Sequence, residues 1–112
     1  MKKWLILALL MSSPTFAGEV LLSWTAPTQN EDGTTLTDLD GYFIYYGTTP
    51  GGPYPIVVEL TDETLTSTVI TGLVADTYYF VATAYNIPGV ESQYSNEATK
   101  IVGTKPNPPI LQ

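Results

Sequence analysis

Carboxylates are the side chains of this sequence with the clearest capacity for chemistry, because it contains no histidine and no cysteine. They come closest together at residues 31–32, 38–40 and 62–63. Two carboxyl groups can hydrolyse a glycosidic bond when a cleft holds their pKa values apart. All three groups fall in or beside predicted loops, and the sequence has neither a Gly-x-Ser-x-Gly elbow nor a phosphate-binding loop. The sequence therefore predicts a protein that is not an enzyme and that uses no cofactor.

One of these loops is rich enough in oxygen ligands to raise the question of calcium. Asn30, Glu31, Asp32, Asp38 and Asp40 lie in it or beside it, and hard cations favour such ligands. Their spacing does not match the EF-hand pattern, and acidic loops are ordinarily solvated. We assign no metal site from the sequence, and calcium binding by this loop stays an open alternative.

Aromatic side chains form the second group with a capacity for binding. Residues 40–47 and 77–86 alternate bulky apolar with smaller or polar side chains at period two, as in strands with one face on a core. Tyrosine offers a large contact area and a polar tip, which suits recognition of proteins or sugars. Alternatively, aromatic residues simply favour strands and pair across them. The alternation places four aromatic side chains on one outward face: Phe43, Tyr45, Tyr79 and Tyr85.

The elements that must position these residues are short strands separated by proline and glycine. Pro27, Gly33, Gly72 and Pro88, with the cluster at residues 48–53, mark the turns. No segment with helical periodicity follows the first seventeen residues. This pattern predicts an all-β sandwich of about six or seven antiparallel strands. The strands are expected at residues 19–25, 40–47, 55–60, 65–71, 77–86 and 95–101.

The same alternation predicts the core. Trp24 should be structural rather than a ligand-stacking residue, and its truncation to alanine should cost about 3–5 kcal/mol. The expected inward-facing residues are Val20, Leu22, Trp24, Leu39, Tyr42, Ile44, Tyr46, either Ile56 or Val57, Ile70, Leu73, Tyr78, Phe80 and Ala98.

Four motifs in order resemble a fibronectin type III domain over about residues 19–102. Residues 22–27 (Leu-Ser-Trp-Thr-Ala-Pro) resemble the family's second strand, and residues 39–46 (Leu-Asp-Gly-Tyr-Phe-Ile-Tyr-Tyr) its third. Residues 71–78 resemble its Thr-Gly-Leu corner, and residues 94–97 the start of its last strand. The details are similar to single-domain bacterial and phage versions. The resemblance implies an immunoglobulin-like sandwich that acts as a spacer or a binding surface.

The corner departs from the family pattern and leaves two alternatives. Ala75 and Asp76 stand where Pro-Gly is usual, so either Tyr78 or Tyr79 could be the corner tyrosine that hydrogen-bonds back to the backbone. A one-residue slip would turn every side chain of the strand to the other face. We favour Tyr78, because it turns Phe80, Ala82 and Ala84 inward, whereas Tyr79 would turn Val81, Thr83 and Tyr85 inward.

The family's first strand is short or missing, which leaves the tryptophan strand at an exposed sheet edge. Residues 103–112 form a Pro-rich extended tail through Pro106, Pro108 and Pro109. This tail resembles the start of a following repeat, so the tail of one molecule could associate head-to-tail with the edge of the next. We expect the last strand to end at the pole far from the N-terminus. The alternative is a disordered stub.

The first seventeen residues have the features of a cleaved signal peptide. Lys2 and Lys3 precede an apolar run at residues 4–11, and Ala17 ends a small-residue cleavage site. The run is too short to span a bilayer, so we expect a secreted or periplasmic domain with no stable membrane span. After cleavage two lysines, Lys100 and Lys105, face eleven acidic residues, which argues against nucleic-acid binding.

The sequence therefore predicts three parts: a signal peptide (1–17), a fibronectin type III domain (18–102) and the tail (103–112). The leading functional hypothesis is an exported non-catalytic module for protein–protein interaction or a structural spacer. The alternative is a carbohydrate-binding accessory module that uses the tyrosine stripe. Neither the protein or glycan ligand nor the oligomeric state follows from the sequence.

Overall fold

The computed structural model describes residues 18–112, and all of its regular structure is β. The predicted signal peptide and the question of a strand ahead of the tryptophan strand both concern residues outside this part. Each predicted strand overlaps an observed one, and the all-β prediction is confirmed. The six strands are β1 (Gly18–Ser23), β2 (Leu39–Gly47), β3 (Ile56–Leu60), β4 (Ser67–Leu73), β5 (Asp76–Asn86) and β6 (Ala98–Val102). Within residues 18–112, no helix is long and apolar enough to span a membrane.

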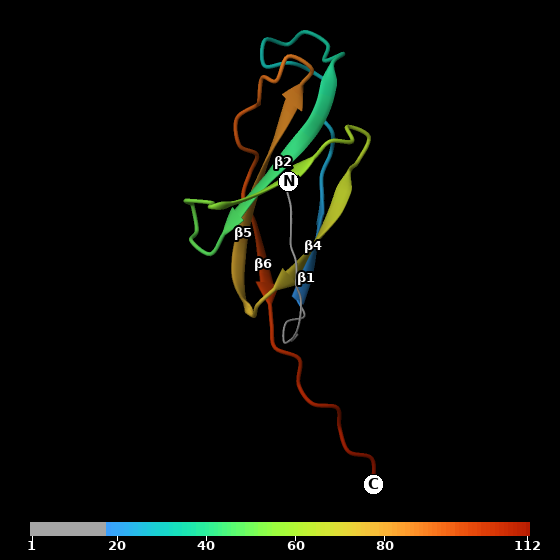
Figure 1. Ribbon diagram of the computed structural model, residues 1–112, viewed down its shortest axis with the longest axis vertical. Coiled ribbons are helices and arrows are strands. Elements are labelled where there is room, and N and C mark those ends of the chain that lie inside the picture. The colour runs from blue at the N-terminus through green and yellow to red at the C-terminus, as the bar shows by residue number, and fades with distance from the viewer. Residues whose placement is uncertain (1–17) are drawn as a thin grey trace.

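The strands form two sheets that pack as the predicted sandwich (Figure 1). One sheet has two strands in the order β1-β4, and the other has four in the order β3-β2-β5-β6. All neighbouring strands are antiparallel. The apolar core lies between the sheets, with Ile44 only 1% exposed. The core comprises Val20, Leu22, Ile44, Tyr46, Ile70, Leu73, Tyr78, Phe80 and Val102.

The corner tyrosine is Tyr78. Its hydroxyl donates a hydrogen bond of 2.8 Å to the carbonyl of Val74, four residues back, and its ring is buried beside Phe80 and Tyr46. This register turns Phe80 into the core and Tyr79 away from it. The corner therefore fixes which aromatic residues of β5 remain on the outer side of the four-stranded sheet.

The core prediction is wrong for β3. Ile56 is 46% and Val57 is 50% exposed. Ile56 pairs with Tyr46 and therefore faces the same, inner side of the sheet. It is, however, the first residue of an edge strand, which the smaller, two-stranded sheet covers poorly. Val58 and Leu60 pack against the core instead.

Three further residues expected inside are only half-buried: Trp24, Leu39 and Ala98. Trp24 packs on the margin of the core, with its ring 5.2 Å from that of Tyr42. Its indole nitrogen is buried and has no hydrogen-bond partner within the described chain, and the same holds for the Tyr42 hydroxyl. Trp24 is therefore a structural residue at the border of the sandwich rather than at its centre.

The start of β1 and the end of β6 lie at the same pole of the sandwich. Gly18 packs so closely on Val102 that a Cβ atom on it would collide with that side chain. The expectation that the last strand ends far from the N-terminal strand is therefore wrong for the described chain. The reason is that β1 itself runs away from this pole. Residues 103–112 then extend from it, exposed along their whole length (Figure 1).

Candidate functional site

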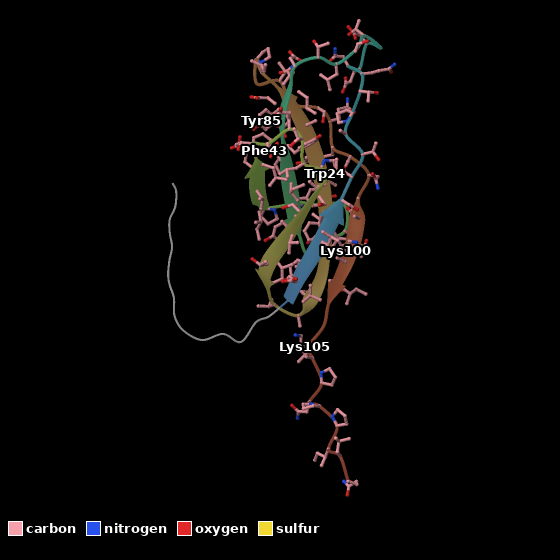
Figure 2. The ribbon with its side chains drawn as sticks, turned by 90° about the vertical axis from the view of Figure 1, so that its right-hand side faces the viewer. Trp24, Phe43, Tyr85, Lys100 and Lys105 are labelled. Atoms are coloured by element: carbon pink, nitrogen blue, oxygen red, sulfur yellow. The ribbon has the colours of Figure 1, made fainter. Side chains whose placement is uncertain are left out.

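Aromatic side chains gather on the outer side of the four-stranded sheet. Phe43 of β2 lies 5.0 Å from Tyr85 of β5 and 6.1 Å from Tyr45 between ring centroids, and Figure 2 shows Phe43 next to Tyr85. Tyr94 continues the row at 5.3 Å from Tyr45, and Tyr54 follows at 5.6 Å from Tyr94. We call these five residues the aromatic face.

Local backbone geometry brings Tyr85 across the sheet. Gly41 of β2 lies beneath the Tyr85 ring, and a Cβ atom there would come within 2.5 Å of the Tyr85 hydroxyl and of the Leu60 carbonyl oxygen. The absence of a side chain on Gly41 thus lets the tyrosine reach over β2. Its hydroxyl donates a 2.8 Å hydrogen bond to Glu59 on β3. One side chain therefore ties three neighbouring strands together.

An irregular segment covers the middle of β5. The amides of Ser92 and Ser95 donate to the carbonyls of Ala84 and Ala82, each at 2.8 Å. In return, the two serine hydroxyls accept from the Ala84 and Ala82 amides, at 3.0 and 2.9 Å. Side-chain oxygens thus take the place of strand carbonyls between β5 and the start of β6. This segment carries Tyr94 onto the aromatic face.

The same segment explains why two outward-facing residues of β5 are buried. Val81 and Thr83 are each only 4% exposed. The Thr83 hydroxyl donates a 2.6 Å hydrogen bond to Glu91, and the Tyr45 hydroxyl donates to the same carboxylate oxygen. The outer side of this sheet therefore has a small second layer of packing instead of a bare, solvated surface.

A third tyrosine–carboxylate pair closes the far end of the face. The Tyr54 hydroxyl donates a 2.5 Å hydrogen bond to Glu97, and the Gly51 amide donates to the same oxygen at 2.8 Å. These bonds fasten the β2–β3 turn to the approach of β6.

All three hydroxyls have raised pKa values. Burial and the hydrogen bond to Glu91 raise the pKa of Tyr45 to about 12. The hydrogen bonds to Glu97 and to Glu59 raise the pKa values of Tyr54 and Tyr85, respectively, to about 12. Each phenol therefore stays protonated near neutral pH and acts as a hydrogen-bond donor rather than as a base.

The structure brings together three of the four residues predicted for the stripe. Phe43, Tyr45 and Tyr85 are in contact, and all are half-buried because they stack on each other. Tyr79 lies on the same side of the sheet, opposite Gly47 and two residues along β5 from Val81, the partner of Tyr45. It takes no part in the ring contacts that join the other three. Sequence reasoning missed Tyr54 and Tyr94, since both lie outside the regular strands, where alternation gives no direction. Pairing of these tyrosines with glutamates could have identified them only if the residues had already been known to lie close together in space.

A hollow of about 400 Å³ adjoins one end of the aromatic face. It lies between the loop that follows β1 and the loop that follows β5. Two residues connect it to the aromatic face: Tyr85, which belongs to the face, and Glu91, which binds the Tyr45 hydroxyl. The hollow's other polar lining residues are amides and acids from the first loop, Gln29, Asn30, Glu31 and Asp32, with Asn86 and Ser92 from the other side. Side chains that donate and accept hydrogen bonds thus surround a concave site with an aromatic wall.

The acidic residues singled out in the sequence do not converge. Asp32 accepts hydrogen bonds from the Thr34 hydroxyl and amide, at 2.6 and 3.0 Å, and the hydroxyl contact is the main cause that lowers its pKa. Asp62 is held in the same way by Thr64. Over residues 18–112, no three acidic side chains lie close enough together to hold a metal ion. Both aspartates therefore act as local turn formers, and we assign no metal site to either loop.

Comparison with known proteins adds no assignment: no family model, no curated protein and no solved structure matches this chain.

Proposed function

We propose that this chain is an exported, non-catalytic fibronectin type III module that binds another protein through its aromatic face. The fibronectin resemblance rests on the four sequence motifs. It is supported by the Tyr78 corner bond to Val74 and by the division of the strands into sheets of two and four. Export rests on the signal-peptide features of residues 1–17.

The observation that carries the proposal is the aromatic face itself. Protein interfaces are enriched in tyrosine because it contributes large area and a hydrogen-bonding tip with few rotatable bonds. Here Tyr94, which lies between Tyr45 and Tyr54 in the row, is 56% exposed, while these two neighbours are held by carboxylates. A partner would therefore meet a rigid surface, which lowers the entropic cost of binding. A role as a bare spacer would not require this arrangement.

Affinity capture from the cell-surface fraction of the source organism tests the proposal. The wild-type chain is compared with a Tyr94→Ser variant and with a Tyr79→Ser control, since Tyr79 lies on the same sheet side but outside the face. We expect a protein partner that is recovered by the wild type and the control and is depleted about tenfold or more with Tyr94→Ser. Equal recovery by all three chains would contradict the proposal.

The hollow beside Tyr85 favours a second candidate, a carbohydrate-binding module. Amide and carboxylate side chains can bind sugar hydroxyls while the tyrosine ring supplies the apolar wall. A glycan array separates the two functions: binding that is lost on Asn30→Ala but kept on Tyr94→Ser would assign the hollow to a sugar. If no glycan is bound, the carbohydrate candidate is rejected and protein binding remains as the proposed function.

A further inference from the structure

Strand β1 has an open edge within the described part of the chain. Its one hydrogen-bonded neighbour there is β4. The Trp24 amide donates to the Thr66 carbonyl on that side at 2.9 Å. Because the backbone groups of an antiparallel ladder alternate in direction, the N–H and C=O groups of Leu22 also point to β4. Those of Leu21 and Ser23 point to the open side, ready to pair with another strand.

A groove runs beside this edge and reaches the core. Its volume is about 370 Å³, more than ten times the ~30 Å³ that one water molecule occupies, so it is large enough for an apolar side chain. The groove borders the end of β1 and the two residues after this strand, whereas from β6 only the first residue, Ala98, lines it. Figure 2 shows Trp24 just beyond the end of β1. The apolar lining is drawn from both sheets and includes Leu22, Trp24, Ile44, Phe80, Ala82 and Ala98.

The groove distinguishes β1 from the other outer strands. Strands β3, β4 and β6 also lack a second neighbour among the described strands. However, within residues 18–112 only at β1 does the groove accompany the open edge. A strand that adds there can bury apolar side chains in the groove and also form backbone hydrogen bonds. The two-stranded sheet also gains most from a third strand, since a pair of strands is the least stable sheet.

The C-terminal tail has the features of a strand without a partner. Residues 103–112 are extended and exposed, and Ile110 and Leu111 near their end are 83% and 92% exposed. The tail carries no acidic side chain, whereas residues 18–102 carry all eleven. Pro106, Pro108 and Pro109 lack backbone N–H groups, whereas residues 110–112 after them form an unbroken run of donors.

Chain direction selects a second copy as the source of the tail. Since Gly18 and Val102 share one pole, a tail that turned back along its own β1 would run parallel to it. A tail arriving from a copy beyond the other pole would run antiparallel and would meet Trp24 and the groove first. The proline segment, at about 3.3–3.6 Å per residue, would bridge the two domains.

We propose that residues 110–112 of one copy pair with the open edge of β1 in a second copy and place an apolar side chain in the groove. The contact is heterologous, so each copy can both donate and accept, and the chain assembles head to tail. This assembly does not depend on the aromatic face.

Sedimentation of the full-length chain, expressed with its export signal and recovered after export, tests the association. We expect the weight-average mass of the wild type to rise with concentration beyond that of a dimer. The Ile110→Asp/Leu111→Asp variant should weaken association about tenfold or more, because it removes the apolar contact. Asn107→Asp adds charge to the same tail and should assemble like the wild type. A wild type that stays monomeric up to about 1 mM, a weak affinity, would overturn the proposal.

Cysteine cross-linking tests the position of the contact, because the natural chain has no cysteine. A Gln112→Cys copy is mixed with a Ser23→Cys copy under oxidising conditions. The control acceptor is Val57→Cys, a half-exposed residue on the outer strand β3. We expect the mixed disulfide to form with Ser23→Cys at several times the yield found with Val57→Cys. Equal yields would show that the tail does not select β1 and would refute the assignment.

Discussion

Replacing Gly41 by alanine is the sharpest test of how the aromatic face is built. The new Cβ atom would lie 2.5 Å from the Leu60 carbonyl oxygen and from the Tyr85 hydroxyl, far inside van der Waals contact. Forcing extra atoms into a packed site costs about 1–3 kcal/mol. The lower chain entropy of alanine in the unfolded state returns about 0.4–1 kcal/mol. The steric cost is the larger, so we expect a net loss of about 1–2 kcal/mol.

Thermal unfolding measures this loss, and a titration shows where it arises. For a domain of this size the loss corresponds to a fall of about 4–16 °C in Tm. Because the Tyr85 ring must move away from Glu59, the pKa of Tyr85 should fall from about 12 towards the ordinary tyrosine value of about 10. The chain has eight tyrosines, so the change is read as the difference between the tyrosinate absorbance titrations of the variant and the wild type.

The matched control is Gly103→Ala. A Cβ atom on Gly103 meets no atom within 4 Å, so this variant gains the same chain stiffness without the clash. If Gly41→Ala melts at the temperature of Gly103→Ala, and Tyr85 still titrates near pH 12, then Gly41 does not hold Tyr85 in place and the reasoning is refuted.

Three further predictions concern stability. Tyr78→Phe should lower the unfolding free energy by about 0.5–1.5 kcal/mol, seen as a lower denaturant midpoint at unchanged m-value; an unchanged midpoint would remove the corner bond from the account. The three tyrosines paired with carboxylates have folded pKa values of about 12 against about 10 when unfolded, so the folded state holds more protons between these values. Their stabilisation is therefore complete below pH 10 and is lost as pH rises through 12. Denaturant midpoints measured across this range should fall, and Glu59→Gln should remove the part due to Tyr85; a flat profile would contradict the pairing. Phe80→Ala should cost about 3–5 kcal/mol and more than Trp24→Ala, because Phe80 is 2% exposed and Trp24 only half-buried; calorimetry that ranks them in reverse would show that the tryptophan is the centre of the core.

Regular alternation made the strands and the corner predictable from the sequence. Period-two patterns decide which residues of β2 and β5 share a face. The choice between Tyr78 and Tyr79 stayed open in the sequence, and the need for a packed interior favoured Tyr78. Phe80 beside two alanines fills the space between sheets, whereas Thr83 and Tyr85 would bring polar atoms into it.

Burial by neighbours outside the strands was not predictable in the same way. Thr83 faces outward and is nevertheless buried, since Glu91 and an irregular segment cover it. Ile56 has the inward register and is nevertheless exposed, since the opposing sheet has too few strands to reach it. Alternation gives the direction of a side chain, while its exposure depends on what the rest of the chain places above it.

The aromatic face and the open edge of β1 use different residues, and this makes their contributions separable. A head-to-tail assembly would repeat the aromatic face along its length, and repeated sites bind a multivalent partner more tightly than a single site does, without any new contact. We therefore expect Ile110→Asp/Leu111→Asp to weaken binding to a partner-coated surface while leaving the affinity for a single soluble partner unchanged. Tyr94→Ser should weaken both kinds of binding about tenfold or more and leave the assembly intact. If the tail variant lost affinity for the soluble partner as well, the two surfaces would have to form one site, and their separation would be wrong.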